Sequence, residues 1–258
     1  MDLLVAYEND PAGNNMAKSL SKELEKDGNI CKGKKFDVLV IQSPTISADW
    51  LEEKFDYDNY IFLSKHAAES GQLALTCHNT GNFDVAKFGG NPKQVSIPYS
   101  SFQKSYLQNL WQNREIFSEF HITIEATHHG PTNLSKPCIF IEVGTTEKQW
   151  NDTELCNSVA QIVEKTFDNA FKEFPSSICF GGTHYSEKFT NEVINGKFAL
   201  GTVIPKYALE FLDKKFFEYI VTRNKGAIAA LLDWNSLGRN KQKIIELLSD
   251  TELEVIRV

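Results

Sequence analysis

This 258-residue sequence has neither the pattern of a membrane helix nor the cysteine pattern of a disulfide framework. No apolar run approaches the roughly 18 residues that a membrane helix requires. The N-terminus places an acid, Asp2, where a signal peptide needs a base. The number of cysteines, 5, is odd, and no CxxC pair occurs among them. We therefore expect unpaired, mostly buried cysteines in a cytoplasmic protein that does not associate with membranes.

The short motifs of several common enzyme classes are also absent. The sequence contains no GxGxxG, no GxxxxGK[ST] and no GxSxG, which disfavours a dinucleotide-binding fold, a P-loop enzyme and a standard α/β-hydrolase. It contains no HExxH either, so no zinc site of the helical protease type is expected. Any catalytic centre must therefore be assembled from residues that are distant in the chain.

Short apolar runs alternate with longer amphipathic segments along the whole chain. We expect strands at 3–7, 36–41, 60–63, 73–77, 121–127, 138–143, 178–180 and 198–203. Helices are expected at 16–26, at 154–171 and from a capping Ser100 or Ser101 to 118. The last third is expected to be helical through 207–222, 227–234 and 241–248, with a closing strand at 253–258, and the glycine-rich segment 79–98 is the longest expected loop. This alternation predicts one α/β domain over 1–258, with a mixed, largely parallel central sheet flanked by helices.

Histidine gives the strongest chemical signal. Five of the 6 histidines follow expected strands: His66, His78, His128, His129 and His184. Ligands of open α/β sheets bind outside the carboxyl ends of the strands, where loops from different strands converge. Imidazole suits proton transfer near neutral pH and is also the commonest metal ligand. We predict one shared site from these five histidines and assign no role to His121.

The residues alone leave two chemistries open for this site. One is a mononuclear or dinuclear zinc centre, and the other is a metal-free site that shuttles protons. Glu142 lies near the end of the strand expected at 138–143, where its carboxylate can orient an imidazole or bind an ammonium group. The Gly181-Gly182-Thr183 segment follows another expected strand, and its glycines allow a phosphate or a sugar to approach the backbone closely.

Several ordered segments carry a family resemblance. The first is Thr-His-His-Gly-Pro-Thr at 127–132, followed by Phe-Ile-Glu-Val-Gly at 140–144 and by Trp150. The others are Ser-Lys-His at 64–66, the Gly-Gly-Thr-His-Tyr segment at 181–185 and Ala-Leu-Leu-Asp-Trp at 230–234. Together they resemble the archaeal and plant type of D-aminoacyl-tRNA deacylase over the whole of 1–258. The segment 77–80 departs from the family pattern, in which a proline often precedes the glycine.

The resemblance implies hydrolysis of the ester that joins a D-amino acid to the 3′ end of tRNA. It implies a fold similar to the phosphorylase and peptidyl-tRNA hydrolase type, and up to two zinc ions per chain. On this basis the expected catalytic residues are His128, His129, Glu142 and Lys65. The expected substrate-binding residues are Thr132, Gly181, Gly182, Thr183 and Tyr185. The expected metal ligands are His66, His78 and His184.

Each catalytic residue has a hypothetical role in this chemistry. One of His128 and His129 activates water, directly or through zinc, which lowers the pKa of bound water to about 7. Glu142 orients that imidazole or holds the amino group of the substrate. Lys65, or the backbone amides of Gly181 and Gly182, stabilises the oxyanion.

Two other functions are compatible with the same sequence. A phosphorylase-like enzyme that processes nucleosides would bind ribose and phosphate at the strand ends, and its turnover would depend on phosphate. A non-catalytic tRNA-binding protein would cleave no ester. The expected partner is D-aminoacyl-tRNA, with no DNA and no membrane, and the expected oligomeric state is a monomer.

The charge distribution is compatible with a nucleic acid that binds locally and is released after each reaction. The net charge of -7 argues against coating of nucleic acid through bulk charge. Residues 205–243 nevertheless hold eight basic and four acidic residues, a local +4 that leaves -11 for the rest of the chain. This basic part, within a C-terminal third expected to be helical over about 205–250, is the first candidate for contacts with tRNA phosphates.

Overall fold

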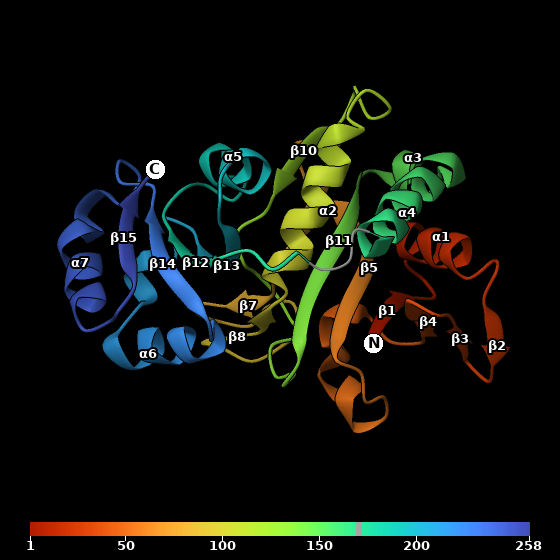
Figure 1. Ribbon diagram of the computed structural model, residues 1–258, viewed down its shortest axis with the longest axis horizontal. Coiled ribbons are helices and arrows are strands. Elements are labelled where there is room, and N and C mark those ends of the chain that lie inside the picture. The colour runs from red at the N-terminus through yellow and green to blue at the C-terminus, as the bar shows by residue number, and fades with distance from the viewer. Residues whose placement is uncertain (169–171) are drawn as a thin grey trace.

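Two β-sheets lie side by side in the computed structural model, which describes residues 1–168 and 172–258. Within these residues the main sheet has the strand order β10-β6-β11-β5-β1-β4-β3-β2, and β9 pairs with β11. A smaller sheet has the order β13-β12-β14-β15, and β7 pairs with β8 in a third, two-stranded sheet. In Figure 1 the smaller sheet lies on the C-terminal side, between α6 (Lys214–Arg223) and α5 (Glu187–Asn195).

The strands have the following bounds. In the main sheet they are β1 (Asp2–Tyr7), β2 (Glu25–Asp27), β3 (Ile30–Lys32), β4 (Phe36–Ile41), β5 (Asn59–Ala67), β6 (Ala74–His78), β9 (Ile97–Pro98), β10 (His121–Ile124) and β11 (Pro137–Thr145). In the smaller sheets they are β7 (Gly81–Asn82), β8 (Gln94–Val95), β12 (Ser176–Phe180), β13 (Ala199–Ile204), β14 (Ala227–Leu232) and β15 (Glu254–Arg257).

The pairing confirms the predicted sheet type. In the main sheet β4, β1, β5 and β11 run parallel, and β10 runs parallel to β6. The antiparallel pairs there are β6 with β11, β3 with β4 and β2 with β3. All three pairs of the smaller sheet are parallel. The protein therefore has the mixed, largely parallel α/β architecture that the alternation of segments predicts. Its expected likeness to the phosphorylase and peptidyl-tRNA hydrolase type stays a prediction.

Helices cover the main sheet, which explains the continuous apolar runs of its central strands. One core cluster joins a face of this sheet to α1 (Pro11–Leu20), α2 (Ser100–Gln112) and α4 (Thr153–Asp168). A second cluster joins the opposite face to the 3-10 helix η1 (Thr45–Glu53). Strands buried on both faces carry apolar residues at successive positions. None of the helices in the described part of the chain has both the length and the apolarity that crossing a bilayer requires.

The remaining helical elements are short. They are α3 (Glu147–Trp150) and α7 (Lys241–Ser249), with the 3-10 helices η2 (Leu209–Phe211) and η3 (Gly238–Asn240). A third core cluster packs α6 and α7 against the smaller sheet.

The expected helix at 227–234 is wrong, because residues 227–232 form β14. The run Ala-Ile-Ala-Ala-Leu-Leu favours a helix by propensity. In the folded chain it lies between β12 and β15, with residues 229–232 fully buried. Burial in the centre of a sheet outweighs a helix preference of less than about 1 kcal/mol per residue.

Other boundaries differ by part of an element. The first helix begins at Pro11, because Asp10 caps it by accepting a hydrogen bond from Gly13 N at 2.9 Å. It ends at Leu20, so the expected range 16–26 is displaced. Helix α2 has Tyr99 at its N-cap position without a side-chain cap, so neither serine caps it.

Other expected segments also differ from the observed elements. Strand β10 stops at Ile124, and the helix expected over 207–222 is η2 followed by α6. The expected loop 79–98 contains the short strands β7, β8 and β9. The end of the helix expected at 154–171, residues 169–171, lies outside the described residues.

Candidate active site

A cavity of about 580 Å³ opens where loops after several strands converge. Four of the five predicted histidines line it, together with two glutamates and other polar and aromatic side chains. Its lining includes Tyr7, Asp10, Ile46, Lys65, His66, Phe88, Glu125, His128, His129, Glu142, His184 and Tyr185. Four of the five histidines that were predicted to share a site thus meet at this cavity, and His78 is not part of its lining.

The backbone connects the two sheets at this cavity. Ala126 N donates to His184 O at 2.7 Å, and Thr127 N donates to Val203 O at 3.0 Å. These bonds join the segment after β10 to the loop after β12 and to strand β13. His184 is therefore held beside His128 although the two residues lie on loops that follow strands of different sheets, and their ring centroids are 4.7 Å apart.

Glu125 lies at the centre of the cluster, with 2 % of its surface exposed. Its Oε2 accepts a hydrogen bond from His184 Nε2 at 2.8 Å and lies 3.7 Å from His128 Nε2. Its Oε1 lies 3.1 Å from His66 Nδ1. Burial alone raises a carboxyl pKa, but the hydrogen bond from His184 and the ion pair with His66 hold the pKa of Glu125 well below its usual value. Glu125 is therefore an ionised carboxylate among imidazoles.

His66 is shared by two carboxylates. Its Nδ1 also lies 3.1 Å from Glu142 Oε2, and its Nε2 lies 2.9 Å from the hydroxyl of Tyr185. Burial lowers the pKa of His66, but Glu125 and Glu142 outweigh it and raise this pKa to about 10. The imidazole is therefore protonated at neutral pH and donates from both nitrogens. Since His66 donates to the Tyr185 oxygen, the hydroxyl proton of Tyr185 is available to another acceptor.

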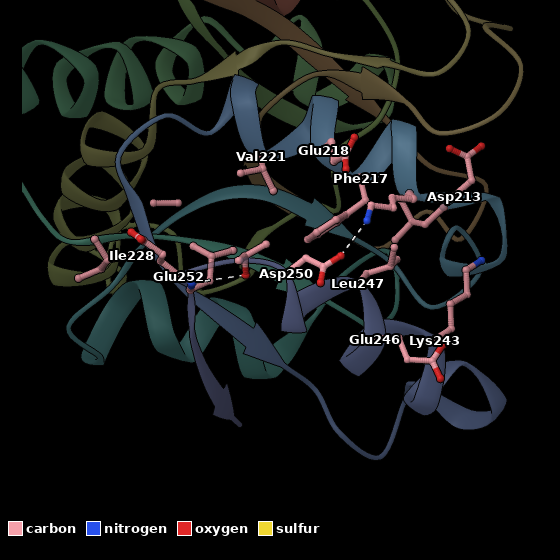
Figure 2. A pocket seen from close by; sticks show the side chains of 15 residues that line it. Asp213, Phe217, Glu218, Val221, Ile228, Lys243, Glu246, Leu247, Asp250 and Glu252 are labelled. Atoms are coloured by element: carbon pink, nitrogen blue, oxygen red, sulfur yellow. Dashed lines mark hydrogen bonds and ion pairs between the residues drawn. The ribbon is translucent and has the colours of Figure 1, made fainter.

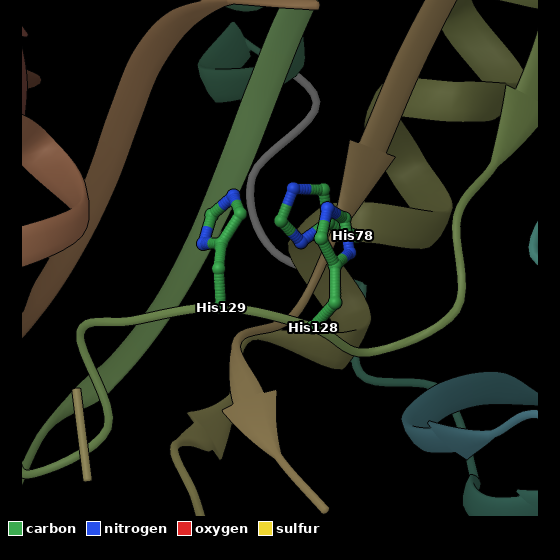
Figure 3. A group of neighbouring side chains, drawn as sticks. All are labelled: His78, His128 and His129. Carbon is green, nitrogen blue, oxygen red and sulfur yellow. The ribbon is translucent and has the colours of Figure 1, made fainter. Parts of the chain in front are cut away.

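Three further imidazoles are grouped on the other side of the cluster, as Figure 3 shows. His78 ends β6, and His128 and His129 lie on the loop after β10. Their ring centroids are 4.1 to 4.7 Å apart. His129 has a φ of 44°, in the left-handed region that non-glycine residues seldom occupy. This turn brings two neighbouring side chains to the same group.

Backbone carbonyls fix the same tautomer in all three rings. His78 Nδ1 lies 3.2 Å from Asn79 O. His128 Nδ1 lies 2.8 Å from Ala126 O, and His129 Nδ1 lies 2.7 Å from Gly130 O. A carbonyl can only accept, so each Nδ1 carries the donated proton and each Nε2 of a neutral ring keeps its lone pair. Metal-binding histidines show this arrangement, with the second nitrogen bonded to a carbonyl or carboxylate.

The electrostatics keep two of these rings neutral. Burial, followed by the charge of His78, lowers the pKa of His129 to about 4. Burial and the charges of His78 and His129 hold the pKa of His128 well below its usual value. Burial lowers the pKa of His78 as well, but Glu142 reverses this and raises it. Neutral imidazoles with a free Nε2 accept protons or bind metal ions.

The predicted catalytic residues all line the cavity, but two of them have unexpected partners. Glu142 contacts His66 and lies 3.6 Å from His78 Nε2. The expectation that it orients His128 or His129 is therefore wrong, and the carboxylate nearest to His128 is Glu125. Lys65 holds its ammonium group 4.6 Å above the ring of Trp150, at the edge of the site.

The expected oxyanion role of the backbone amides of Gly181 and Gly182 is also wrong. Gly181 N donates to Ile204 O at 2.8 Å, and Gly182 N donates to Ser236 Oγ at 2.6 Å. Both amides are thus occupied. Gly181 has a φ of 100°, and a Cβ there would lie 2.3 Å from Ser236 Oγ. The glycines form the turn that carries the chain from β12 to His184.

Of the other predicted substrate-binding residues, only Tyr185 lines the cavity. Thr183 Oγ1 donates to Tyr185 O at 2.7 Å, within the turn. Thr132 is 1 % exposed and its Oγ1 accepts from Asn91 N at 2.8 Å. Both threonines therefore stabilise loops that carry the site.

The predicted metal ligands fall into different groups of ligating atoms. His78 groups with His128 and His129, whereas His184 groups with Glu125 and His128, and His66 groups with Glu125 and Glu142. The ligating atoms within each group lie within 4.8 Å of one another. His66, His78 and His184 do not form one ligand set among the described residues.

Sequence reasoning missed Glu125, the residue that contacts most of the cluster. Its signal was its place on the polar face of the segment after His121, three residues before His128. It also missed Asp10, whose Oδ2 accepts from Ser64 Oγ at 3.0 Å and from Lys65 N at 2.9 Å. Asp10 thereby connects the start of α1 to the end of β5 beside the cavity.

A larger cavity, of about 770 Å³, lies between α6, α7 and the edge of the smaller sheet (Figure 2). Its lining combines apolar side chains such as Phe217 and Leu247 with five acidic residues, and it contains no histidine. Lys214 Nζ donates to Asp250 Oδ2 at 2.8 Å across its rim. Without groups that transfer protons near neutral pH, this cavity is not the candidate active site.

Comparison with known proteins identifies similar chains. A family model described as D-aminoacyl-tRNA deacylase matches residues 53–256. A D-aminoacyl-tRNA deacylase of Cenarchaeum symbiosum is 56% identical over 256 residues, which cover 99% of each chain. One of Archaeoglobus fulgidus is 31% identical over 250 residues, covering 90% of each. The crystal structure of a conserved protein of unknown function, AF0625, superposes with a TM-score of 0.93 at 29% identity and covers 100% of this chain and 95% of that one.

The negative charge of Glu125 contributes to the raised pKa of His66, which a substitution at Glu125 tests. In Glu125→Gln one of the two carboxylates at His66 Nδ1 becomes neutral, so the pKa of His66 should fall from about 10 toward its usual value. Titration of the imidazole resonances by NMR measures this shift. Glu147→Gln, a change of the same kind in the first turn of α3, should leave the pKa of His66 unchanged. An unaltered titration of His66 in Glu125→Gln would contradict the assigned contact.

Proposed function

The chain belongs to the D-aminoacyl-tRNA deacylase family, and from this membership we propose that it hydrolyses the ester between a D-amino acid and the 3′ end of tRNA. The products are the free D-amino acid and a tRNA that can be charged again. The observation that supports this most strongly is the convergence of four histidines and two glutamates on one cavity of about 580 Å³. Ester hydrolysis requires proton transfer to and from oxygen atoms, which these groups perform.

Water is activated by His128 or His129. An aminoacyl ester is already reactive, so a positioned water and modest base catalysis suffice. The free Nε2 of either ring accepts a proton as the water oxygen bonds to the ester carbon. Glu125 Oε2, 3.7 Å from His128 Nε2, stabilises the imidazolium formed there. The same proton then passes to the ribose oxygen as the carbon–oxygen ester bond breaks.

The substrate is held by groups on the opposite wall. Glu142 is 5 % exposed and faces the cavity, where its carboxylate binds the ammonium group of the amino acid. The hydroxyl proton of Tyr185 is directed to the ester carbonyl oxygen, because the Tyr185 oxygen already accepts from His66 Nε2 at 2.9 Å. Lys65 is retained as a second group that stabilises negative charge on this oxygen.

The residues fit a zinc ion, which the family resemblance implies. His78 Nε2 is buried and has no hydrogen-bond partner among the described residues, as expected of an atom that binds a ligand. His78, His128 and His129 would hold the ion, and in that state the Nε2 lone pairs of His128 and His129 bind zinc instead of a proton. Glu125, His128 and His184 are an alternative ligand group, because the one free Nε2 of His128 binds only one ion. Bound zinc supplies a Lewis acid and lowers the pKa of a bound water to about 7. Because Glu142 raises the pKa of His78, the ion competes with a proton there.

Contacts with tRNA phosphates are proposed at Lys206. Most basic side chains of 205–243 already have partners: Lys214 and Arg239 pair with acids, Arg223 and Lys243 donate to backbone carbonyls, and Lys241 stacks on Trp234. Lys206 is exposed, and its backbone N donates to Gly182 O at 2.9 Å, beside the loop that carries His184. The acidic cavity between α6 and α7 (Figure 2) repels phosphate from the rest of the segment 205–243.

A cytoplasmic location and a monomeric state are part of the same proposal. Aminoacyl-tRNA is made and used in the cytoplasm, and all the residues to which the proposal gives a role belong to this one chain.

Alanine at His128 or His129 tests the proton-transfer roles. Each variant should lower kcat for D-aminoacyl-tRNA by about a hundredfold or more, since general base catalysis contributes roughly 10²–10⁴. Binding of deacylated tRNA, measured by filter retention, should change little. His121→Ala serves as the control, because His121 belongs neither to the cavity lining nor to the groups of ligating atoms. Full activity in both His128→Ala and His129→Ala would refute the assignment.

Zinc binding is expected to follow the three-imidazole group. Calorimetric titration of metal-free protein with zinc should show tight binding, which His78→Ala weakens by about tenfold or more because one of three ligands is lost. His121→Ala should bind zinc as the unmodified chain does. Equal affinities of the unmodified protein and His78→Ala would exclude this ligand group.

A further inference from the structure

Phe88 combines two properties that seldom occur together. Its side chain is 66% exposed, yet it lines the cavity that contains the histidines. Among the described residues it is the only exposed large apolar side chain in that lining. A solvated aromatic ring at the mouth of a polar site offers a flat surface on which another planar group can stack.

The backbone around Phe88 is anchored, so the ring is presented from a fixed position. Phe88 O accepts from Gly130 N at 3.0 Å. At the next residue, a Cβ on Gly89 would lie 1.9 Å from Ile46 O, so only glycine permits this approach of two backbones. Asn82 Nδ2 donates to Gly89 O at 2.9 Å. A preorganised ring loses little conformational entropy when a ligand stacks on it.

The same contacts place the ring beside the reacting groups. Gly130, the hydrogen-bond partner of Phe88, directly follows His129, which we propose to act on the ester. The ester oxygen of an aminoacyl-tRNA belongs to the ribose of the terminal adenosine, so the adenine base is one sugar away from the reacting carbon. A base in that position lies at the mouth of the cavity while the amino acid points to the glutamates inside.

We propose that Phe88 is the stacking platform for the 3′-terminal adenine of the substrate, an assignment that rests on the proposed deacylase function. Proteins bind single-stranded nucleic acids by stacking bases on aromatic rings, and basic groups nearby hold the backbone. The adjacent Lys87 is exposed and supplies such a group. Phe88 is thus a substrate-binding residue, because it contacts the base and leaves the ester to the histidines.

Steady-state kinetics of Phe88→Ala test the platform. Loss of base stacking should raise KM by about tenfold or more with kcat changed less than about twofold. Phe88→Trp keeps a stacking ring and should restore KM. Val85→Ala, in the same loop and 56% exposed but outside the cavity lining, should leave KM unchanged. A KM for Phe88→Ala equal to that of Val85→Ala would overturn the proposal.

Comparing KM for two substrates shows whether the Phe88 ring contacts the base or the amino acid. A platform for adenine predicts the same rise in KM for D-alanyl-tRNA and D-tyrosyl-tRNA, because both carry the same terminal nucleotide. A rise confined to D-tyrosyl-tRNA would overturn the proposal, since the ring would then contact the amino acid side chain.

A fluorescence experiment separates this proposal from the deacylase activity itself. Deacylated tRNA with 2-aminopurine in place of the terminal adenine should lose fluorescence when it binds the unmodified protein or Phe88→Trp. It should keep its fluorescence when bound to Phe88→Ala. Quenching needs no turnover, so a chain that quenches but cleaves no ester would refute only the proposed function. Equal quenching by Phe88→Ala and the unmodified protein would refute the platform.

Discussion

Glu125 is a buried carboxylate around which the candidate site is organised. With 2 % of its surface exposed, its charge would be very costly without compensating partners. The compensation comes from His66 at 3.1 Å and His184 at 2.8 Å, which belong to different sheets. The compensated carboxylate therefore joins the end of β5 to the loops after β10 and β12. The same compensation makes His66 cationic and places His128 beside a negative charge.

The second constraint is the fixed tautomer of the other imidazoles. Backbone carbonyls accept hydrogen bonds from the Nδ1 atoms of His78, His128 and His129, so Nε2 is the nitrogen left to react in each ring. The left-handed backbone at His129 and the close contact at Gly89 belong to the same local structure. Strain of this kind persists where the surrounding structure enforces it, and it is concentrated at functional sites. The site therefore combines a charged half, around His66, with a neutral half, around His129.

Sequence patterns predicted the sheet and the place of the site, because both depend on local signals. The buried strands are continuous apolar runs, and five histidines lie at the end of such a run or shortly after it. Strand β14 was mispredicted because its alanines and leucines favour a helix and only its neighbours β12 and β15 make it a strand. Glu125 was missed because a single acid on a polar strand face looks like a solvated side chain. The amides of Gly181 and Gly182 were wrongly expected to be free for an oxyanion, because their acceptors, Ile204 O and Ser236 Oγ, lie far along the chain.

Cleavage of matched D- and L-aminoacyl-tRNAs by the purified protein tests the central claim most directly. The substrates should carry the same amino acid in both configurations on the same tRNA, and the release of amino acid should be followed over time with and without a zinc chelator. The account predicts hydrolysis of the D-aminoacyl ester at a rate well above the spontaneous one, with the L-aminoacyl ester left largely intact. Equal cleavage of both substrates, or cleavage of neither, would contradict it.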